Sequence, residues 1–172
     1  MTISIGKKIC IIGLSSSGKS TLADIIAKKR NLNLLHLDQI GHIPNTNWVP
    51  APAEEWMPRH DKFIEQDNWV VDGCYFRTMT QRLAKADTVI FIKMSRFGCA
   101  YRFVKRALQK KKDRFGKLEG ATDDCNLAML KYILLEAPRK FSKYEKLIKE
   151  NPHLKVIYLY SFDDINKLVE NL

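Results

Sequence analysis

Several features that mark particular classes of protein are missing from this sequence. Its four cysteines are widely spaced and form no C-x-x-C pair, which argues against a zinc site or a redox dithiol and favours reduced, mostly buried thiols. No apolar run reaches the roughly 20 residues that a membrane-spanning helix requires. There is also no low-complexity tract or internal repeat, so we expect neither a repeat array nor a disordered chain.

The start of the chain, residues 1–6, lacks the charged segment, long apolar run and cleavage site of a secretory signal. Together with the missing membrane span, this predicts a soluble, cytoplasmic protein without a membrane partner. At 172 residues, of which 45% are hydrophobic, the chain suits one domain with a buried core. We therefore expect residues 1–172 to form a single domain.

Acidic residues are too few to balance the basic ones. The chain has 29 Lys and Arg against 19 Asp and Glu, a formal net charge of +10. Such an excess favours polyanionic partners, namely nucleotide phosphates, a phosphorylated substrate or nucleic acid. The charge does not distinguish among them, so the motifs have to.

Residues 13–20, with the sequence G-L-S-S-S-G-K-S, match the P-loop pattern G-x-x-x-x-G-K-[ST]. In such a loop, successive backbone N–H groups converge on a phosphate, Lys19 neutralises phosphate charge and the hydroxyl of Ser20 holds Mg²⁺. The motif predicts that a nucleotide binds here. The residues predicted to bind it are Gly13, Ser15, Ser16, Ser17, Gly18, Lys19, Ser20 and Thr21.

The sequence on both sides of this loop fits a P-loop, which must leave a buried strand and enter a helix. Residues 8–12 form a short apolar run, and Leu22, Ile25 and Ile26 recur at helical spacing after the loop. The N-terminus of that helix adds free N–H groups and partial positive charge to the phosphate site. A plain Gly/Ser turn is the alternative, and the flanking pattern argues against it.

Residues 34–38 are predicted to form a second strand that ends in the carboxylate of Asp38. This places Asp38 at the carboxyl edge of the sheet, where open α/β folds bind their ligands. Residues 38–41 also fit D-x-x-G, a pattern found in GTPases, but the chain has no N-K-x-D motif for guanine recognition. The sequence therefore argues against a GTPase.

A third strand, residues 69–73, carries Asp72 near its end. In P-loop enzymes an acidic residue that ends the strand beside the P-loop strand orders the Mg²⁺ shell, directly or through water. Asp72 and Ser20 are therefore the predicted metal-binding residues. The alternative is a helix-capping aspartate at the edge of the sheet.

The most basic part of the chain follows a fourth strand at residues 88–94, which is continuously apolar, as in a parallel strand covered on both faces. In the helix after it, Arg102 and Arg106 are four residues apart and share one face. Two arginines on one face suit phosphoryl transfer, in which charge spreads over the oxygens of the transferred group. The alternative for each arginine is a solvated surface charge, which we favour for Lys110 to Lys112.

Two segments outside the sheet are expected to close over the site. Residues 38–67, a proline-punctuated loop followed by a helix, are assigned to an acceptor-side subdomain. Residues from about 106 to 139 form the predicted lid region, with a polar, turn-prone stretch at 115–126. Pro138 is expected to kink the helical pattern that follows, leaving Arg139 near the bend, where it would reach the phosphates from the other side of the lid.

A fifth strand at residues 155–160 and a last helix that begins with a capping box at 161–164 complete the pattern. Five strands that alternate with helices, with a P-loop after the first strand, predict a doubly wound α/β domain.

The combined motifs make the chain similar to the adenylate-kinase-related proteins of the DNA topology modulation protein family. The residues that carry the likeness are 13–20, the H-L-D sequence at 36–38, the D-G-x-Y turn at 72–75, and Arg96, Arg102 and Arg106. The resemblance implies a P-loop NTPase three-layer sandwich whose five-stranded parallel sheet has the order 2-3-1-4-5 of nucleoside monophosphate kinases, with a helical lid. It also implies ATP and Mg²⁺ as cofactors.

By this resemblance, the chain would transfer the γ-phosphate of ATP to a small-molecule or nucleotide acceptor. Lys19, the loop amides and Mg²⁺ would hold the β- and γ-phosphates, while Arg102 and Arg106 stabilise the transferring group. Asp38 would bind, deprotonate or simply orient an acceptor hydroxyl. The alternative hypothesis is a nucleotide-binding protein that acts on DNA through its basic helix.

The substitution Lys19→Ala tests the P-loop assignment. It should abolish nucleotide-dependent activity, by roughly 100-fold or more, because a fixed positive charge beside the phosphates is removed. Thermal unfolding should change little. Lys28→Ala, on the outward face of the same predicted helix, is the matched control, and nucleotide turnover that survives Lys19→Ala would contradict the assignment.

Overall fold

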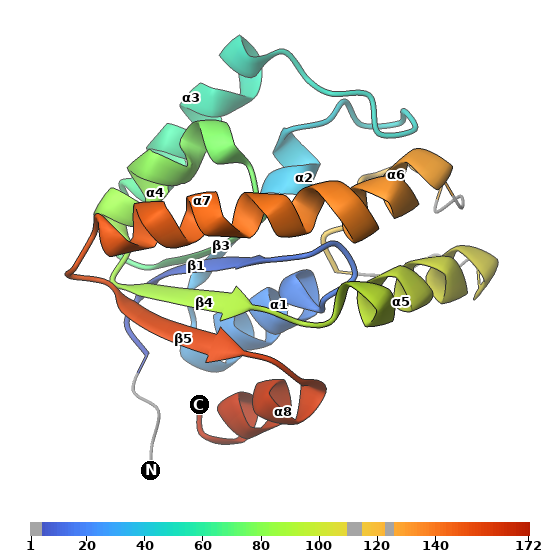
Figure 1. The fold of residues 1–172 in the computed structure, drawn as a ribbon. Coiled ribbons are helices and arrows are strands. Elements are labelled where there is room, and N and C mark those ends of the chain that lie inside the picture. Colours follow the sequence, from blue (N-terminus) through green and yellow to red (C-terminus); the bar gives the residue numbers. More distant parts are fainter. Residues whose placement is uncertain (1–4, 110–114, 123–125) are drawn as a thin grey trace.

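The core of the fold is a five-stranded parallel sheet in the order β2-β3-β1-β4-β5. The computed structural model describes residues 5–109, 115–122 and 126–172. The strands are β1 (Lys8–Gly13), β2 (Asn33–His36), β3 (Trp69–Asp72), β4 (Thr88–Ile92) and β5 (Lys155–Leu159). The predicted sheet order is confirmed, and the strand that leads into the P-loop lies in the middle of the sheet (Figure 1).

Helices cover both faces of this sheet, because successive strand side chains point to opposite sides. Ile9 and Ile11 of β1 belong to one hydrophobic cluster, which they share with α1 (Lys19–Arg30), α5 (Arg96–Gln109) and α8 (Phe162–Glu170). Cys10 and Ile12 belong to the other cluster, shared with α3 (Ala53–Ile64), α4 (Met79–Lys85) and α7 (Ala137–Lys149). The result is the predicted three-layer sandwich (Figure 1).

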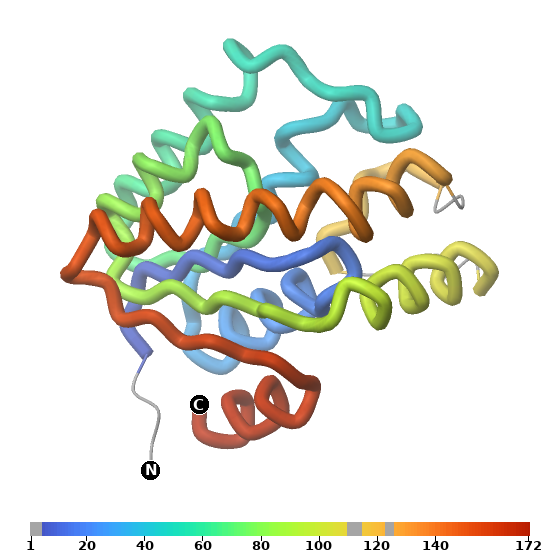
Figure 2. The backbone as a smooth tube through the Cα atoms, viewed as in Figure 1, coloured from blue at the N-terminus to red at the C-terminus, as the bar shows by residue number. Residues whose placement is uncertain are grey.

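Four short elements complete the described part of the chain. They are α2 (Leu37–Ile40), the 3₁₀ turn η1 (Phe76–Thr78), α6 (Leu127–Lys131) and the π-helical turn η2 (Tyr132–Glu136). Figure 2 shows that α5 and α6 extend beyond the carboxyl ends of the strands, where the P-loop lies. None of the helices in the described ranges is long and apolar enough to cross a membrane.

The second strand is shorter than predicted. β2 ends at His36 and the chain turns at once into α2, so Asp38 lies in the first turn of a short helix and not at a strand end. The turn buries Leu37 completely beneath Gly73, where an added Cβ would lie 2.9 Å from the Cβ of Leu37. An acidic side chain in the first turn also suits the partial positive charge of a helix N-terminus.

Pro138 affects the helix before it through a lost hydrogen bond. Proline has no N–H to donate, so the carbonyl of Leu134, four residues earlier, loses its helical partner. The helix widens into the π turn η2, in which the N–H of Ala137 donates to the carbonyl of Tyr132. The guanidinium of Arg96 donates to the carbonyl of Leu134 at 3.1 Å, which satisfies the freed acceptor.

The last helix begins with the predicted capping box. The N–H of Asp164 donates to the Ser161 hydroxyl at 3.1 Å, and the N–H of Ser161 donates to the Asp164 carboxylate at 2.9 Å. Phe162 follows directly, so the box fixes its ring beside the P-loop, where an added Cβ on Gly18 would lie 3.5 Å from Phe162 Cε1.

A buried arginine holds the turn that follows β3. Arg82 of α4 has no exposed surface, and its guanidinium donates to the carbonyls of Gly73 (3.0 Å), Tyr75 (3.1 Å) and Thr78 (3.4 Å). A buried charge is tolerated when its donors are satisfied in this way. The same bonds fix the path of the chain between Asp72 and Tyr75.

The substitution Arg82→Met should lower the free energy of unfolding by about 2–4 kcal/mol, because buried carbonyls are left without donors. Chemical denaturation followed by circular dichroism measures the loss. Arg77→Met, on the exposed side of the neighbouring 3₁₀ turn, should change stability by less than about 0.5 kcal/mol. Equal losses in the two variants would contradict this role for Arg82.

Candidate active site

The P-loop has the backbone geometry that its glycines allow. It leaves β1 at Gly13 and enters α1 at Lys19, with φ of 154° at Gly13 and 94° at Gly18. A Cβ on Gly13 would lie 2.6 Å from the carbonyl oxygen of Ile92, so only glycine fits there. The loop therefore brings its backbone to the N-terminus of α1, where N–H groups and partial positive charge favour a phosphate.

Side chains of the loop and its neighbours hold it in place. Lys19 Nζ donates to the carbonyl of Leu14 at 2.7 Å, so the lysine lies over the loop. The thiol of Cys74 donates to the carbonyl of Gly13 at 3.0 Å, and the N–H of Gly13 contacts the same sulfur at 3.2 Å. The first glycine of the loop is thus tied to the turn after β3.

Asp72 joins the loop to two strands. It is buried at the end of β3, where its Oδ2 accepts a hydrogen bond from the Ser20 hydroxyl at 2.7 Å. Its Oδ1 lies 2.5 Å from Nδ1 of His36. The sequence analysis missed His36, although His36 and Asp72 are paired in the parallel register of β2 and β3 and so end at the same edge.

A hydroxyl and a carboxylate that already meet are suitable partners for Mg²⁺, whose ligands are oxygens. Ser20 would bind the ion, and Asp72 would order its shell directly or through water. The described residues include no group of three or more His, Cys, Asp or Glu that would hold a metal alone. Mg²⁺ in a nucleotide site does not need one, because phosphate oxygens and water supply its other ligands.

The P-loop opens into a cavity of about 1200 Å³ whose cationic wall is α5. Arg102, Lys105 and Arg106 line it together with Lys19. Arg102 Nε donates to the carbonyl of Ser16 at 2.8 Å, and its guanidinium lies 4.7 Å from the centre of the Phe162 ring. The structure thus brings both predicted arginines to the phosphate side; their part in transfer stays a prediction.

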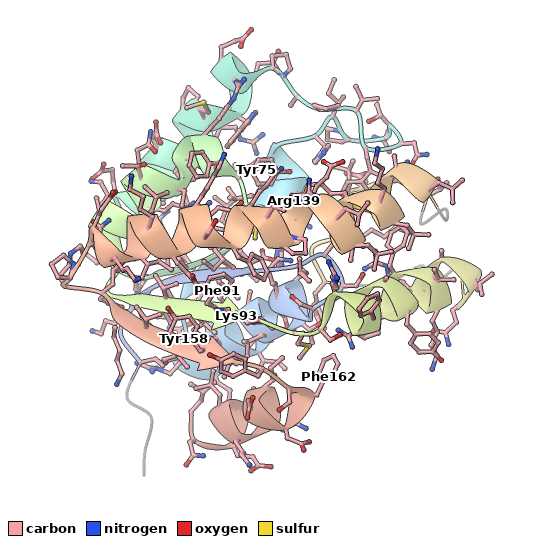
Figure 3. The ribbon with its side chains drawn as sticks, viewed as in Figure 1. Tyr75, Phe91, Lys93, Arg139, Tyr158 and Phe162 are labelled. Atoms are coloured by element: carbon pink, nitrogen blue, oxygen red, sulfur yellow. The ribbon has the colours of Figure 1, made fainter. Side chains whose placement is uncertain are left out.

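Other predicted cations lie elsewhere. Arg139 is exposed on α7 and does not line the cavity, whose wall on that side includes Tyr132 and Glu136 (Figure 3). Its predicted contact with the phosphates therefore has no support from its position. Lys110 to Lys112 lie outside the described residues.

Asp38 faces the same cavity within a hydrogen-bonded group. Its Oδ1 accepts from the Tyr75 hydroxyl at 2.9 Å, and Nδ1 of His42 lies 3.0 Å from its backbone carbonyl and 3.2 Å from the Tyr75 oxygen. Burial, followed by the charge of Asp38, raises the pKa of Tyr75 far above its ordinary value, so Tyr75 remains a donor. Tyr75 and Phe162 lie on opposite sides of the sheet (Figure 3).

Residues 115–122, within the predicted lid region, bridge the two sides of the cavity. Gly116 lies over the metal-binding residues, since an added Cβ would be 2.9 Å from Ser20 Oγ and 3.0 Å from His36 Nδ1. Farther along, the segment bonds to the loop after α2. The bonds join Gln39 Nε2 to the Lys117 carbonyl (3.2 Å), the Asn45 N–H to the Glu119 carbonyl (2.8 Å) and Trp48 Nε1 to the Thr122 carbonyl (3.3 Å).

Comparison with known proteins shows the fold. No protein-family model and no curated protein matches the chain. A shikimate kinase from Bacteroides thetaiotaomicron is similar in structure, with 16% identity and a TM-score of 0.52 over 94% of this chain and 93% of that one. A gluconokinase from Sinorhizobium meliloti 1021 gives 13% identity and a TM-score of 0.48 over 96% of this chain and 88% of that one.

The similarity to shikimate kinase shows that this chain has the P-loop kinase fold. At this level of identity it concerns the fold alone. Membership of the DNA topology modulation family stays a prediction.

The substitution His36→Phe tests the site around Asp72. It should weaken Mn²⁺ binding to the complex with ADP by about 10- to 100-fold, because the second partner of the carboxylate is lost. Electron paramagnetic resonance of Mn²⁺ measures the affinity without turnover. His36→Asn, whose amide N–H reaches the same oxygen, should retain more affinity, and His153→Phe, on the surface, should change nothing; equal binding in all three would contradict the assignment.

Proposed function

We propose that the protein is an ATP-dependent phosphotransferase that uses Mg²⁺ and moves the γ-phosphate of ATP to a hydroxyl group of a small-molecule or nucleotide acceptor. The observation that carries this proposal is the composition of one cavity. Its lining includes the P-loop, three cations of α5 and, opposite them, the carboxylate of Asp38. Phosphoryl transfer needs this combination, because the protein mainly positions the reactants and stabilises charge.

On the donor side, the backbone of residues 13–20 and the N-terminus of α1 would bind the β- and γ-phosphates. Lys19 would leave the carbonyl of Leu14 for the phosphates, which offer it a full negative charge. Mg²⁺, when bound, neutralises charge on the β- and γ-oxygens. Arg102 and Arg106 would stabilise the charge on the transferring group, Arg102 from its position on the Ser16 carbonyl.

On the acceptor side, Asp38 would receive the reacting hydroxyl. The hydroxyl oxygen forms a bond to the γ-phosphorus, the bond from that phosphorus to the bridging oxygen breaks, and its electron pair leaves with ADP. The hydroxyl proton passes to Asp38. Tyr75 holds Oδ1 of Asp38, which fixes the carboxylate for this role.

The DNA-binding alternative has less to support it. Arg102, Lys105 and Arg106 line an internal cavity, and Arg96 is bound to the carbonyl of Leu134. Recognition of a DNA backbone would require basic side chains on an open surface. The position of these residues favours phosphoryl transfer.

The function is tested with ATP labelled on its γ-phosphate and a panel of nucleoside monophosphates, nucleosides and small alcohols. We expect labelled product from at least one acceptor. Asp38→Asn should lower kcat by about 10²- to 10⁴-fold while the affinity for ATP is retained, because only the proton acceptor is lost. Asp67→Asn, on the surface after α3, is the matched control. Intact ATP binding without transfer to any acceptor would contradict the proposal.

A further inference from the structure

We propose that the acceptor is an uncharged hydroxyl compound that binds against Trp48 and His42 with its reacting hydroxyl on Asp38. A nucleoside monophosphate or another acceptor with a phosphate or carboxylate group would bind poorly. This inference rests on the proposed phosphotransferase function and specifies its acceptor. It follows from the distribution of charge, aromatic rings and hydrogen-bonding groups around the cavity.

Charge is distributed unequally between the two sides of the cavity. Within residues 5–109, 115–122 and 126–172, its cationic lining residues are Lys19 of the P-loop and three residues of α5. The acceptor side is lined by Asp38, His42, Trp48 and the neutral amide and hydroxyl groups of Asn47, Thr122 and Asn126. The donor side thus matches a polyphosphate, and the acceptor side has a carboxylate and neutral polar groups.

Arginines near the acceptor side in sequence do not change this distribution. Arg59 and Arg77 are exposed and do not line the cavity. Arg82 is buried and donates to backbone carbonyls. An acceptor phosphate beside Asp38 would therefore face a like charge, and such a pair disfavours binding strongly when it is removed from water.

Trp48 supplies the surface on which an uncharged acceptor would lie. Its backbone has a φ of 61°, a conformation that is costly for a large side chain and that clusters at binding sites. Its indole N–H donates to the Thr122 carbonyl, and its ring meets the His42 ring edge-on with centres 5.3 Å apart. Two contacts thus fix the ring at the cavity wall, where aromatic surface favours carbon-rich, uncharged ligands.

Tyr75 determines which oxygen of Asp38 meets the acceptor. Its hydroxyl donates to Oδ1, and its raised pKa keeps it a donor. The acceptor hydroxyl is therefore assigned to Oδ2, where Asp38 accepts its proton. Tyr75 and His42 form the polar floor of the acceptor site, and Trp48 forms its aromatic wall.

Matched pairs of acceptors test this proposal: glycerol and glycerol 3-phosphate, glucose and glucose 6-phosphate, and adenosine and AMP. ADP release and phosphorus NMR of the products are measured for each pair. We expect transfer to an uncharged member, with kcat/KM at least about tenfold above that of its anionic partner. Transfer that favours the anionic member would overturn this inference and leave the proposed function standing. The absence of transfer to every compound would overturn both.

Variants of the aromatic wall then locate the acceptor, with the best uncharged compound as the probe. Trp48→Ala should raise KM for that acceptor by about 3- to 10-fold and leave KM for ATP unchanged, because only the stacking surface is removed. Trp48→Phe should restore most of the affinity. Val49→Ala, at the exposed neighbour that does not line the cavity, is the control. A Trp48→Ala variant that folds with the original Tm and the original acceptor KM would overturn the assignment.

Discussion

The contacts of one buried carboxylate connect most of the elements that form the site. Asp72 at the end of β3 accepts the hydroxyl of Ser20 from α1 and pairs with His36 at the end of β2. It is almost completely buried, and an ionised group in that position requires partners on both oxygens. The residue thought to order the metal is therefore also the residue that holds the P-loop helix against two strands.

The same economy applies to the arginines, each of which has a different task. Arg82 satisfies carbonyls in the turn after β3, Arg96 satisfies the carbonyl freed by Pro138, and Arg102 binds the P-loop carbonyl of Ser16. Much of the positive charge that the composition displays is thus used on the protein's own backbone. The part that remains near the cavity lies along α5, on the donor side.

The sequence was sufficient for the sheet and the phosphate side, because both depend on local patterns. Apolar runs mark the strands, and the spacing of glycine, lysine and serine marks the loop. Contacts between side chains distant in the sequence could not be predicted in this way. His36 meets Asp72 only through strand register, and Tyr75 meets Asp38 only because β2 stopped short and its chain turned into α2.

The bonds between residues 115–122 and the loop after α2 have a consequence for the order of events. Three hydrogen bonds join these segments, and Gly116 rests on Ser20 and His36. Displacing either segment must break these bonds or carry the other segment with it. Entry of the nucleotide beneath Gly116 and entry of the acceptor beside Trp48 are therefore mechanically linked, and the exchange of one ligand depends on the occupancy of the other.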